Sequence, residues 1–185
     1  MSRMKAKPYF RRNDYILEMS NYKELLTEAT HNVMKVERGH YNCGGFALGT
    51  FDWYLPYERC DEYRERLWEI REDMDYDALG YDEGCDAIAE IYVDFMCSEG
   101  LCRRIDDSSE LRKGEYLVAF KASYDDFHYA RRLANGRWFH KMGGSEIEEI
   151  DEEDVFDYDW WNNLSCEYGG DVCLLAVPYS NSHKI

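Results

Sequence analysis

The hydrophobic pattern of this 185-residue chain changes its period once, near Gly100, and this change limits the folds that the chain can adopt. Before it, apolar residues recur every three or four positions, the spacing of amphipathic helices. These predicted helices span 21–36, 61–77 and 82–99. After it, 116–120 and 171–178 are nearly continuous apolar runs, which are typical of buried strands. A helical half followed by a strand half predicts an α+β fold, and the length fits a single domain over 1–185.

A β-hairpin is predicted around the Asn-Gly dipeptide at 135–136. Both residues of this dipeptide tolerate positive φ, which the tight primed turns of hairpins require. The flanking segments 127–133 and 137–142 are strand-like, so folding about the turn brings His128 and His140 onto neighbouring strands. Because side chains alternate along a strand, a slip of one residue in the pairing would put the two imidazoles on opposite faces.

The charge balance excludes some classes of partner. The chain has 22 lysines and arginines against 38 aspartates and glutamates, and its formal net charge is −16. Such a chain repels phosphate backbones and anionic lipid surfaces, so neither nucleic acid nor a membrane is expected as a partner. The sequence has no segment with the apolar centre of a secretory signal and no apolar run of 18 residues. We therefore expect a cytoplasmic protein.

Cysteine usage indicates a reduced protein. The chain has seven cysteines, an odd number in a domain large enough to fold without covalent cross-links. The closest pairs, Cys97 with Cys102 and Cys166 with Cys173, lack the two-residue spacing of a structural zinc site. No disulfide framework, metal or cofactor is therefore predicted.

An acidic segment over 146–159 has two interpretations. It contains nine carboxylates and no basic residue. In the first interpretation it is a solvated loop or short helix that serves solubility. In the second, the carboxylates form a docking surface for a basic protein partner, and the chain is a binding or inhibitor protein.

Cys43 is the candidate nucleophile because of its position. It lies in the glycine-rich segment 39–50, at the predicted first turn of a short helix, where unpaired backbone N–H groups and the helix dipole favour a thiolate. A cysteine nucleophile needs a base, and the base needs an orienting partner. In the predicted hairpin, His128 and His140 supply these two groups.

Three motifs resemble those of one family. Asn-Cys-Gly-Gly-Phe-Ala at 42–47 resembles the Asp-Cys-Ser-Gly-Phe-Val nucleophile motif of NlpC-type cell-wall peptidases, a bacterial branch of the papain-like cysteine peptidases. Leu-Arg-Lys-Gly-Glu-Tyr-Leu at 111–117 is similar to that family's Leu-x-Pro-Gly-Asp-Leu-Val entry into a central strand. The segment 128–140 is similar to its His-Val-Gly-Ile-Tyr-Leu-Gly-Asn-Gly-x-x-Ile-His hairpin, including the spacing between the two histidines. The resemblance covers 40–50 and 108–150.

The resemblance implies a papain-like fold, in which the nucleophile opens a helix that packs on an antiparallel sheet, and 55–105 would be a helical insertion. It implies Cys43 as the nucleophile, His128 as the general base and acid, and His140 as the orienting member of a Cys-His-His triad. The reaction would be acyl transfer from a peptide or amide through a thioester, with the backbone N–H of Cys43 in the oxyanion site.

The substrate-binding residues implied by the resemblance are Asn42 and Gly44, which replace the family's Asp and Ser on either side of the nucleophile. In such peptidases the Asp and the Ser help to hold the free amine of a cell-wall peptide. The change to Asn42 removes the carboxylate that would pair with that amine, so a different peptide or amide substrate is expected. Trp53 follows the predicted nucleophile helix and is expected to line the substrate cleft.

Overall fold

The computed structural model describes residues 41–50, 52–55, 61–133, 136–164 and 166–183. Its main helices are α3 (Cys43–Leu48), α4 (Asp61–Asp75), α5 (Tyr81–Ser98), α6 (Glu152–Val155) and α7 (Tyr158–Asn162), with 3₁₀ turns at η3 (Ser108–Glu110) and η4 (Tyr179–His183). Its strands are β1 (Arg103–Ile105), β2 (Glu115–Ala122), β3 (Phe127–Arg132), β4 (Trp138–Lys141), β5 (Ile147–Ile150) and β6 (Cys173–Pro178). The helix predicted over 21–36 lies outside the described residues.

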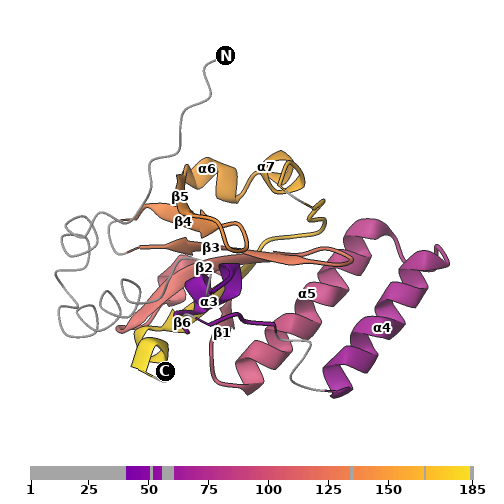
Figure 1. Cartoon of the computed structure of the whole chain (residues 1–185), viewed down its shortest axis with the longest axis horizontal. Coiled ribbons are helices and arrows are strands. Elements are labelled where there is room, and N and C mark those ends of the chain that lie inside the picture. The colour runs from indigo at the N-terminus through magenta and orange to yellow at the C-terminus, as the bar shows by residue number, and fades with distance from the viewer. Residues whose placement is uncertain (1–40, 51, 56–60, 134–135, 165, 184–185) are drawn as a thin grey trace, which may run out of the picture.

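The six strands form one antiparallel sheet in the order β1-β6-β2-β3-β4-β5 (Figure 1). The helices precede most of the strands along the chain, so the α+β prediction is confirmed. The hairpin prediction is also confirmed, because β3 pairs with β4 and Ala130 lies opposite His140. Gly136 has a φ of 86°, a backbone conformation that a glycine adopts at little cost.

Two hydrophobic clusters cover the two faces of the sheet. On one face, Phe120 of β2 and Tyr129 of β3 share a cluster with Phe46 of α3 and Tyr92 of α5. On the other face, the intervening strand residues pack with residues of α6, α7 and the segment that precedes β6. This second cluster contains Leu117, Ala119, Ala130, Trp138, Val155, Trp161 and Tyr168. The sheet is therefore the middle of three layers. The helices α3 and α5 cover one face, and α6 and α7 cover the other.

The segment 55–105 contains α4, α5 and the short strand β1. In Figure 1, α4 and α5 lie side by side at one edge of the molecule. Ile88 and Tyr92 of α5 are buried in the cluster that also contains residues of β2. This helix starts slightly before the predicted residue 82, because Gly80 holds the N-cap position. Gly100 follows the helix with a φ of 66°.

The acidic segment 146–159 forms the edge strand β5 and the helices α6 and α7, whereas the sequence suggested a loop or one short helix. Ile147 and Val155 anchor it in the core, while eight of its carboxylates are exposed. These are residues 146, 148, 149, 151, 152, 153, 157 and 159. Negative charge on an edge strand opposes pairing with a further strand.

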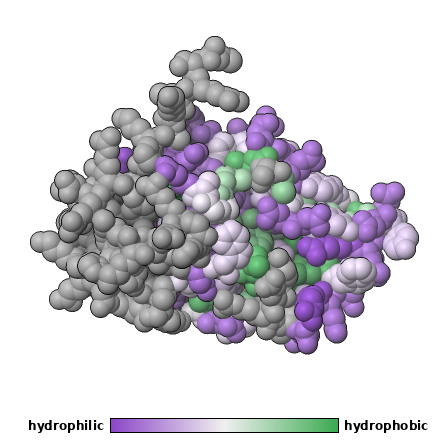
Figure 2. Space-filling view, viewed as in Figure 1, coloured by the Kyte–Doolittle hydropathy of each residue, from purple (hydrophilic) through white to green (hydrophobic). Residues whose placement is uncertain are grey.

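The described surface is largely hydrophilic in the view of Figure 2, where purple side chains line the right-hand edge and a smaller green area lies near the centre. None of the helices that the structure describes combines the length and the apolar character needed to cross a bilayer.

Candidate active site

Asn42 fixes the start of α3 and thereby the position of Cys43. Its Oδ1 accepts hydrogen bonds from the backbone N–H groups of Gly45 (3.1 Å) and Tyr54 (3.1 Å), and its Nδ2 donates to the Tyr54 carbonyl (2.7 Å). The side chain is 5% exposed. Asn42 is thus an N-cap that also ties the helix to the following segment, and Cys43 is the first helical residue, as predicted.

The two glycines after Cys43 allow α3 to pack closely. A Cβ on Gly45 would lie 2.0 Å from the backbone oxygen of Asp52. A Cβ on Gly44 would lie 3.0 Å from the Tyr54 ring and 3.4 Å from the Tyr129 ring. The bare Cα of Gly44 therefore faces protein, and Gly44 does not line the cavity described next; a contact with substrate stays a prediction for it.

Cys43 and His128 line one cavity of about 230 Å³, at the end of the sheet where β3 begins and β4 ends. The predicted residues Asn42 and Trp53 line it too, and Trp53 is about half exposed at its rim. The structure therefore brings four of the predicted site residues to one cavity. The other lining residues, which sequence reasoning missed, are Leu55, Asp125, Asp126, Phe127, Met142, Gly143 and Tyr168.

His128 and His140 form a buried pair. Nε2 of His128 lies 3.0 Å from Nδ1 of His140, a hydrogen bond between the two rings. Both imidazoles lie on one face of the sheet, a point that the sequence left open because it did not fix the register of the hairpin. Trp161 and Tyr168 pack against the His128 ring, and Trp160 packs against the His140 ring, so aromatic side chains enclose the pair.

The thiol and the imidazole pair approach the cavity from different sides of β3. Cys43 belongs to the cluster with Phe127 and Tyr129, whereas the ring of His128 contacts Trp161 on the opposite face. Sγ of Cys43 donates to the Phe127 carbonyl at 3.7 Å, and no hydrogen bond joins it to an imidazole within the described residues. The structure thus pairs the histidines directly, and Cys43 shares its cavity with His128.

Electrostatics keep the Cys43 thiol protonated at rest. Burial and the nearby Asp126 carboxylate raise its pKa to about 12, although the N–H of Gly44 and the Lys141 ammonium act in the opposite direction. The sequence predicted a thiolate favoured by the helix start. That prediction is corrected here, because a helix of six residues contributes less than the loss of hydration and the adjacent negative charge.

Both histidines are neutral near pH 7. Burial is the largest cause that lowers the pKa of His128 far below its ordinary value, and His140 adds repulsion. Burial also lowers the pKa of His140 to about 4. A neutral imidazole has one nitrogen that accepts a proton, so His128 is in the form that a general base requires.

The histidine pair makes stability depend on pH. The pKa of His140 is lower in the folded state than in the unfolded state, so its contribution is complete above about pH 6.5 and is lost as the pH falls toward 4. Between pH 7 and pH 5 we expect this residue alone to lower the free energy of unfolding by about 2 kcal/mol. Urea unfolding at both pH values tests this. A His140→Gln variant should show a weaker pH dependence, and an identical dependence would contradict the burial of a neutral imidazole.

Asp126 is a functional candidate that sequence reasoning missed. One carboxylate oxygen accepts from the Phe127 N–H (2.8 Å), and the other accepts from the Tyr168 hydroxyl (2.9 Å). The carboxylate is thereby held beside the Cys43 thiol, whose pKa it raises. Its position two residues before His128 was the available signal, but only the fold shows that Tyr168 comes to meet it.

Among the described residues, no cluster of His, Cys, Asp or Glu side chains has the arrangement of a metal site. The six described cysteines are all free thiols, and Sγ of Cys97 lies 3.9 Å from Sγ of Cys102.

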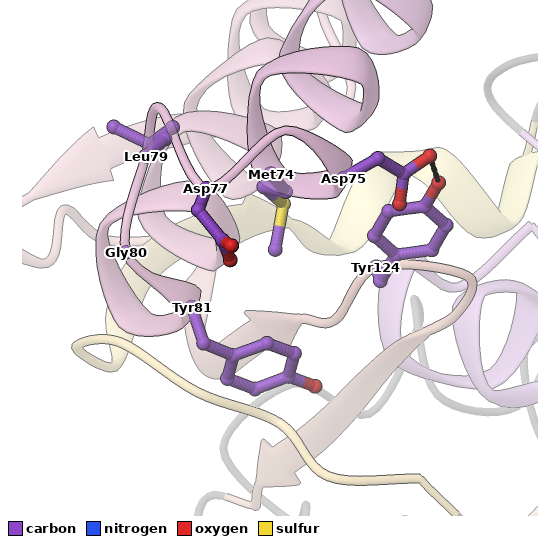
Figure 3. A pocket seen from close by; sticks show the side chains of 7 residues that line it. All are labelled: Met74, Asp75, Asp77, Leu79, Gly80, Tyr81 and Tyr124. Carbon is purple, nitrogen blue, oxygen red and sulfur yellow. Dashed lines mark hydrogen bonds between the residues drawn. The ribbon is translucent and has the colours of Figure 1, made fainter.

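A larger cavity of about 520 Å³ lies between the α4–α5 turn and the β2–β3 turn (Figure 3). The Asp77 carboxylate and the Tyr81 ring border it, and Tyr124 donates its hydroxyl hydrogen to Asp75 (2.8 Å). Its lining has neither a thiol nor an imidazole, so the chemistry of nucleophile and base is assigned to the smaller cavity.

No family model matches the chain, and neither the curated proteins nor the solved structures contain a match.

Proposed function

We propose that the chain is a papain-like cysteine hydrolase that cleaves a peptide or amide by acyl transfer through Cys43. One observation carries the proposal: a buried cysteine at a helix start lines the same cavity as His128, whose buried, neutral imidazole is hydrogen-bonded to His140. A nucleophile, a base and a group that orients the base are the three parts that this chemistry needs.

The histidine pair sets the direction of proton transfer. Because Nε2 of His128 bonds to His140, Nδ1 is the nitrogen that accepts the proton from Cys43. This requires the tautomer in which His128 Nε2–H donates to Nδ1 of His140. A general base acts on its proton directly or through one water molecule, and the cavity that Cys43 and His128 share supports a transfer of this kind.

The reaction then proceeds in two stages. Sγ of Cys43 forms a bond to the substrate carbonyl carbon while its proton passes to His128, and backbone N–H groups at the start of α3 stabilise the oxyanion. The C–N bond breaks, the amine leaves with the proton from His128, and a thioester remains on Cys43. Water, deprotonated by His128, attacks the thioester and releases the acid and the thiol.

The first test is the alkylation of Cys43 by limiting iodoacetamide between pH 5 and pH 9, followed by mass spectrometry. His128→Ala should slow alkylation of Cys43 at least tenfold, because a positioned base contributes a factor of about 10² or more. Cys85, which is buried and distant in sequence from the site, is the internal control and should be unaffected. Equal rates at Cys43 in both proteins would contradict the proposal. With a peptide or amide library, turnover should require Cys43.

A second candidate function is a binding protein that engages a basic partner through the segment 146–159. The exposure of eight carboxylates there favours it, as do the exposed rings of Phe156 and Tyr158 among them. Association of this kind weakens as salt screens the charges. It differs from the hydrolase in that it does not need Cys43.

A further inference from the structure

Lys141 is a buried lysine on the same face of the sheet as Cys43. It is the last residue of β4 and follows His140, so alternation along the strand directs it away from the histidine pair. Its side chain is almost fully buried. Nζ donates to the carbonyls of Gly143 (2.6 Å) and Ser145 (2.8 Å) and lies 5.0 Å from the centre of the Tyr41 ring.

The charge of Lys141 has no carboxylate partner within the described parts of the chain. Its hydrogen bonds go to two neutral carbonyls, although a buried ammonium is costly unless a negative charge faces it. The sheet contains a second buried lysine, Lys121, which faces the carboxylates of Asp82 and Asp86. The comparison singles out Lys141 as the buried ammonium that has no carboxylate beside it among the described residues.

The Cys43 thiol lies on the side of the sheet toward which Lys141 points. Nζ of Lys141 packs over the ring of Tyr41, two residues before Cys43, α3 contacts β4, and Met142 and Gly143 line the cavity with Cys43. Lys141 and Cys43 influence each other: the ammonium favours the thiolate, and the thiolate favours the ammonium. The other charged side chain that acts on Cys43 is Asp126, which opposes ionisation. The positive charge of Lys141 therefore lowers the pKa of the Cys43 thiol, whereas Asp126 and burial raise it.

We propose that Lys141 is the electrostatic partner of Cys43, and that its buried ammonium stabilises the negative charge that forms on Sγ when the thiol proton leaves. The inference rests on the proposed hydrolase function and deepens it. His128 takes the proton at the cavity, while Lys141 stabilises the sulfur anion from the face on which α3 packs. The hydrogen bonds of Lys141 also hold the segment 142–145, of which Met142 and Gly143 line the cavity.

The test compares Lys141→Met with Lys121→Met. Methionine has a similar length without charge, and the alkylation rates are compared only between variants that keep the circular dichroism of the wild type. At pH 7, Lys141→Met should slow iodoacetamide alkylation of Cys43 about tenfold, which corresponds to a rise of about one unit in the thiol pKa. Lys121→Met should change the rate less than about twofold.

Two further measurements distinguish an electrostatic role of Lys141 from a purely structural one. They are the pH dependence of the Cys43 alkylation rate and the dependence of that rate on the charge of the reagent. The pKa of Lys141 is lowered to about 8, so its charge is present below that pH and lost above it. The advantage of the wild type over Lys141→Met should accordingly shrink as the pH rises from 7 to 9. The rate of iodoacetate, an anion, relative to neutral iodoacetamide should fall severalfold at Cys43 in Lys141→Met, and this ratio does not depend on the thiolate fraction.

The outcomes separate the two proposals. An unchanged ratio of iodoacetate to iodoacetamide in Lys141→Met, or an equal loss in Lys121→Met, overturns the role of Lys141. A rate at Cys43 that does not depend on His128 overturns the hydrolase, whatever the result with Lys141. A change in the ratio together with independence from His128 would leave a Cys43–Lys141 pair without a catalytic base.

Discussion

Replacing Gly45 with alanine should lower the free energy of unfolding by about 4 kcal/mol, since it combines backbone overpacking with the loss of buried hydrogen bonds. The new Cβ would lie 2.0 Å from the carbonyl oxygen of Asp52 and 3.0 Å from its nitrogen. Both are backbone atoms, so no side-chain rotation relieves the contact. Residues 52–54 would have to move away from α3, and the hydrogen bonds between Asn42 and Tyr54 would break.

Gly84→Ala is the matched control. A Cβ on Gly84 would lie 2.4 Å from Sδ, 2.5 Å from Cγ and 2.7 Å from Cε of Met74, which are all atoms of one flexible side chain that can change its rotamer. Alanine also favours the helical conformation of α5 by about 1 kcal/mol relative to glycine. We expect Gly84→Ala to stay within about 1 kcal/mol of the wild type in urea unfolding followed by circular dichroism. An equal loss of unfolding free energy in the two variants would show that α3 can shift to accommodate the new Cβ. It would contradict the steric explanation given for Gly45→Ala.

The sequence predicted best those features that depend on local pattern. The Asn-Gly turn and the strand-like segments around it predicted the β3–β4 hairpin and put His128 and His140 on neighbouring strands. The register, which the sequence did not fix, brings both rings to one face. The pairing makes them diagonal neighbours, because the direct partner of His140 is Ala130. That distance suits two rings that each extend toward the other.

Features set by long-range packing were not predictable. Alternation along β4 puts Lys141 and His140 on opposite faces of the sheet. The sequence does not show which face α3 covers, so it did not predict that Lys141 lies near Cys43. The three-residue strand β1 has too few residues for a recognisable period, and it forms because β6 offers a free edge. The raised pKa of Cys43 likewise reflects burial, which the pattern around a cysteine does not measure.

Asn42→Ala should lower the free energy of unfolding by about 3 kcal/mol. Loss of an N-cap costs about 1 kcal/mol, and each backbone group of Tyr54 that loses a buried partner adds about 1 kcal/mol or more. Asp107→Ala is the comparison, because Asp107 also caps a helical turn, by accepting from the Ser109 N–H, but at an exposed site. We expect a loss of at most about 1 kcal/mol there.

The stability and the turnover of Asn42 variants decide whether the Asn42 side chain serves the fold or the substrate. If its amide serves the fold, Asn42→Ala loses stability, and Asn42→Asp, which keeps the acceptor for Gly45 and Tyr54 but loses the donor to the Tyr54 carbonyl, loses stability as well. If its amide serves the substrate, Asn42→Ala remains as stable as the wild type and loses turnover alone. The three hydrogen bonds of the side chain favour the first outcome. Asn42→Asp also restores the carboxylate of the motif that the segment 42–47 resembles, so any gain in activity toward a substrate with a free amine would come from charge rather than from a repaired cap.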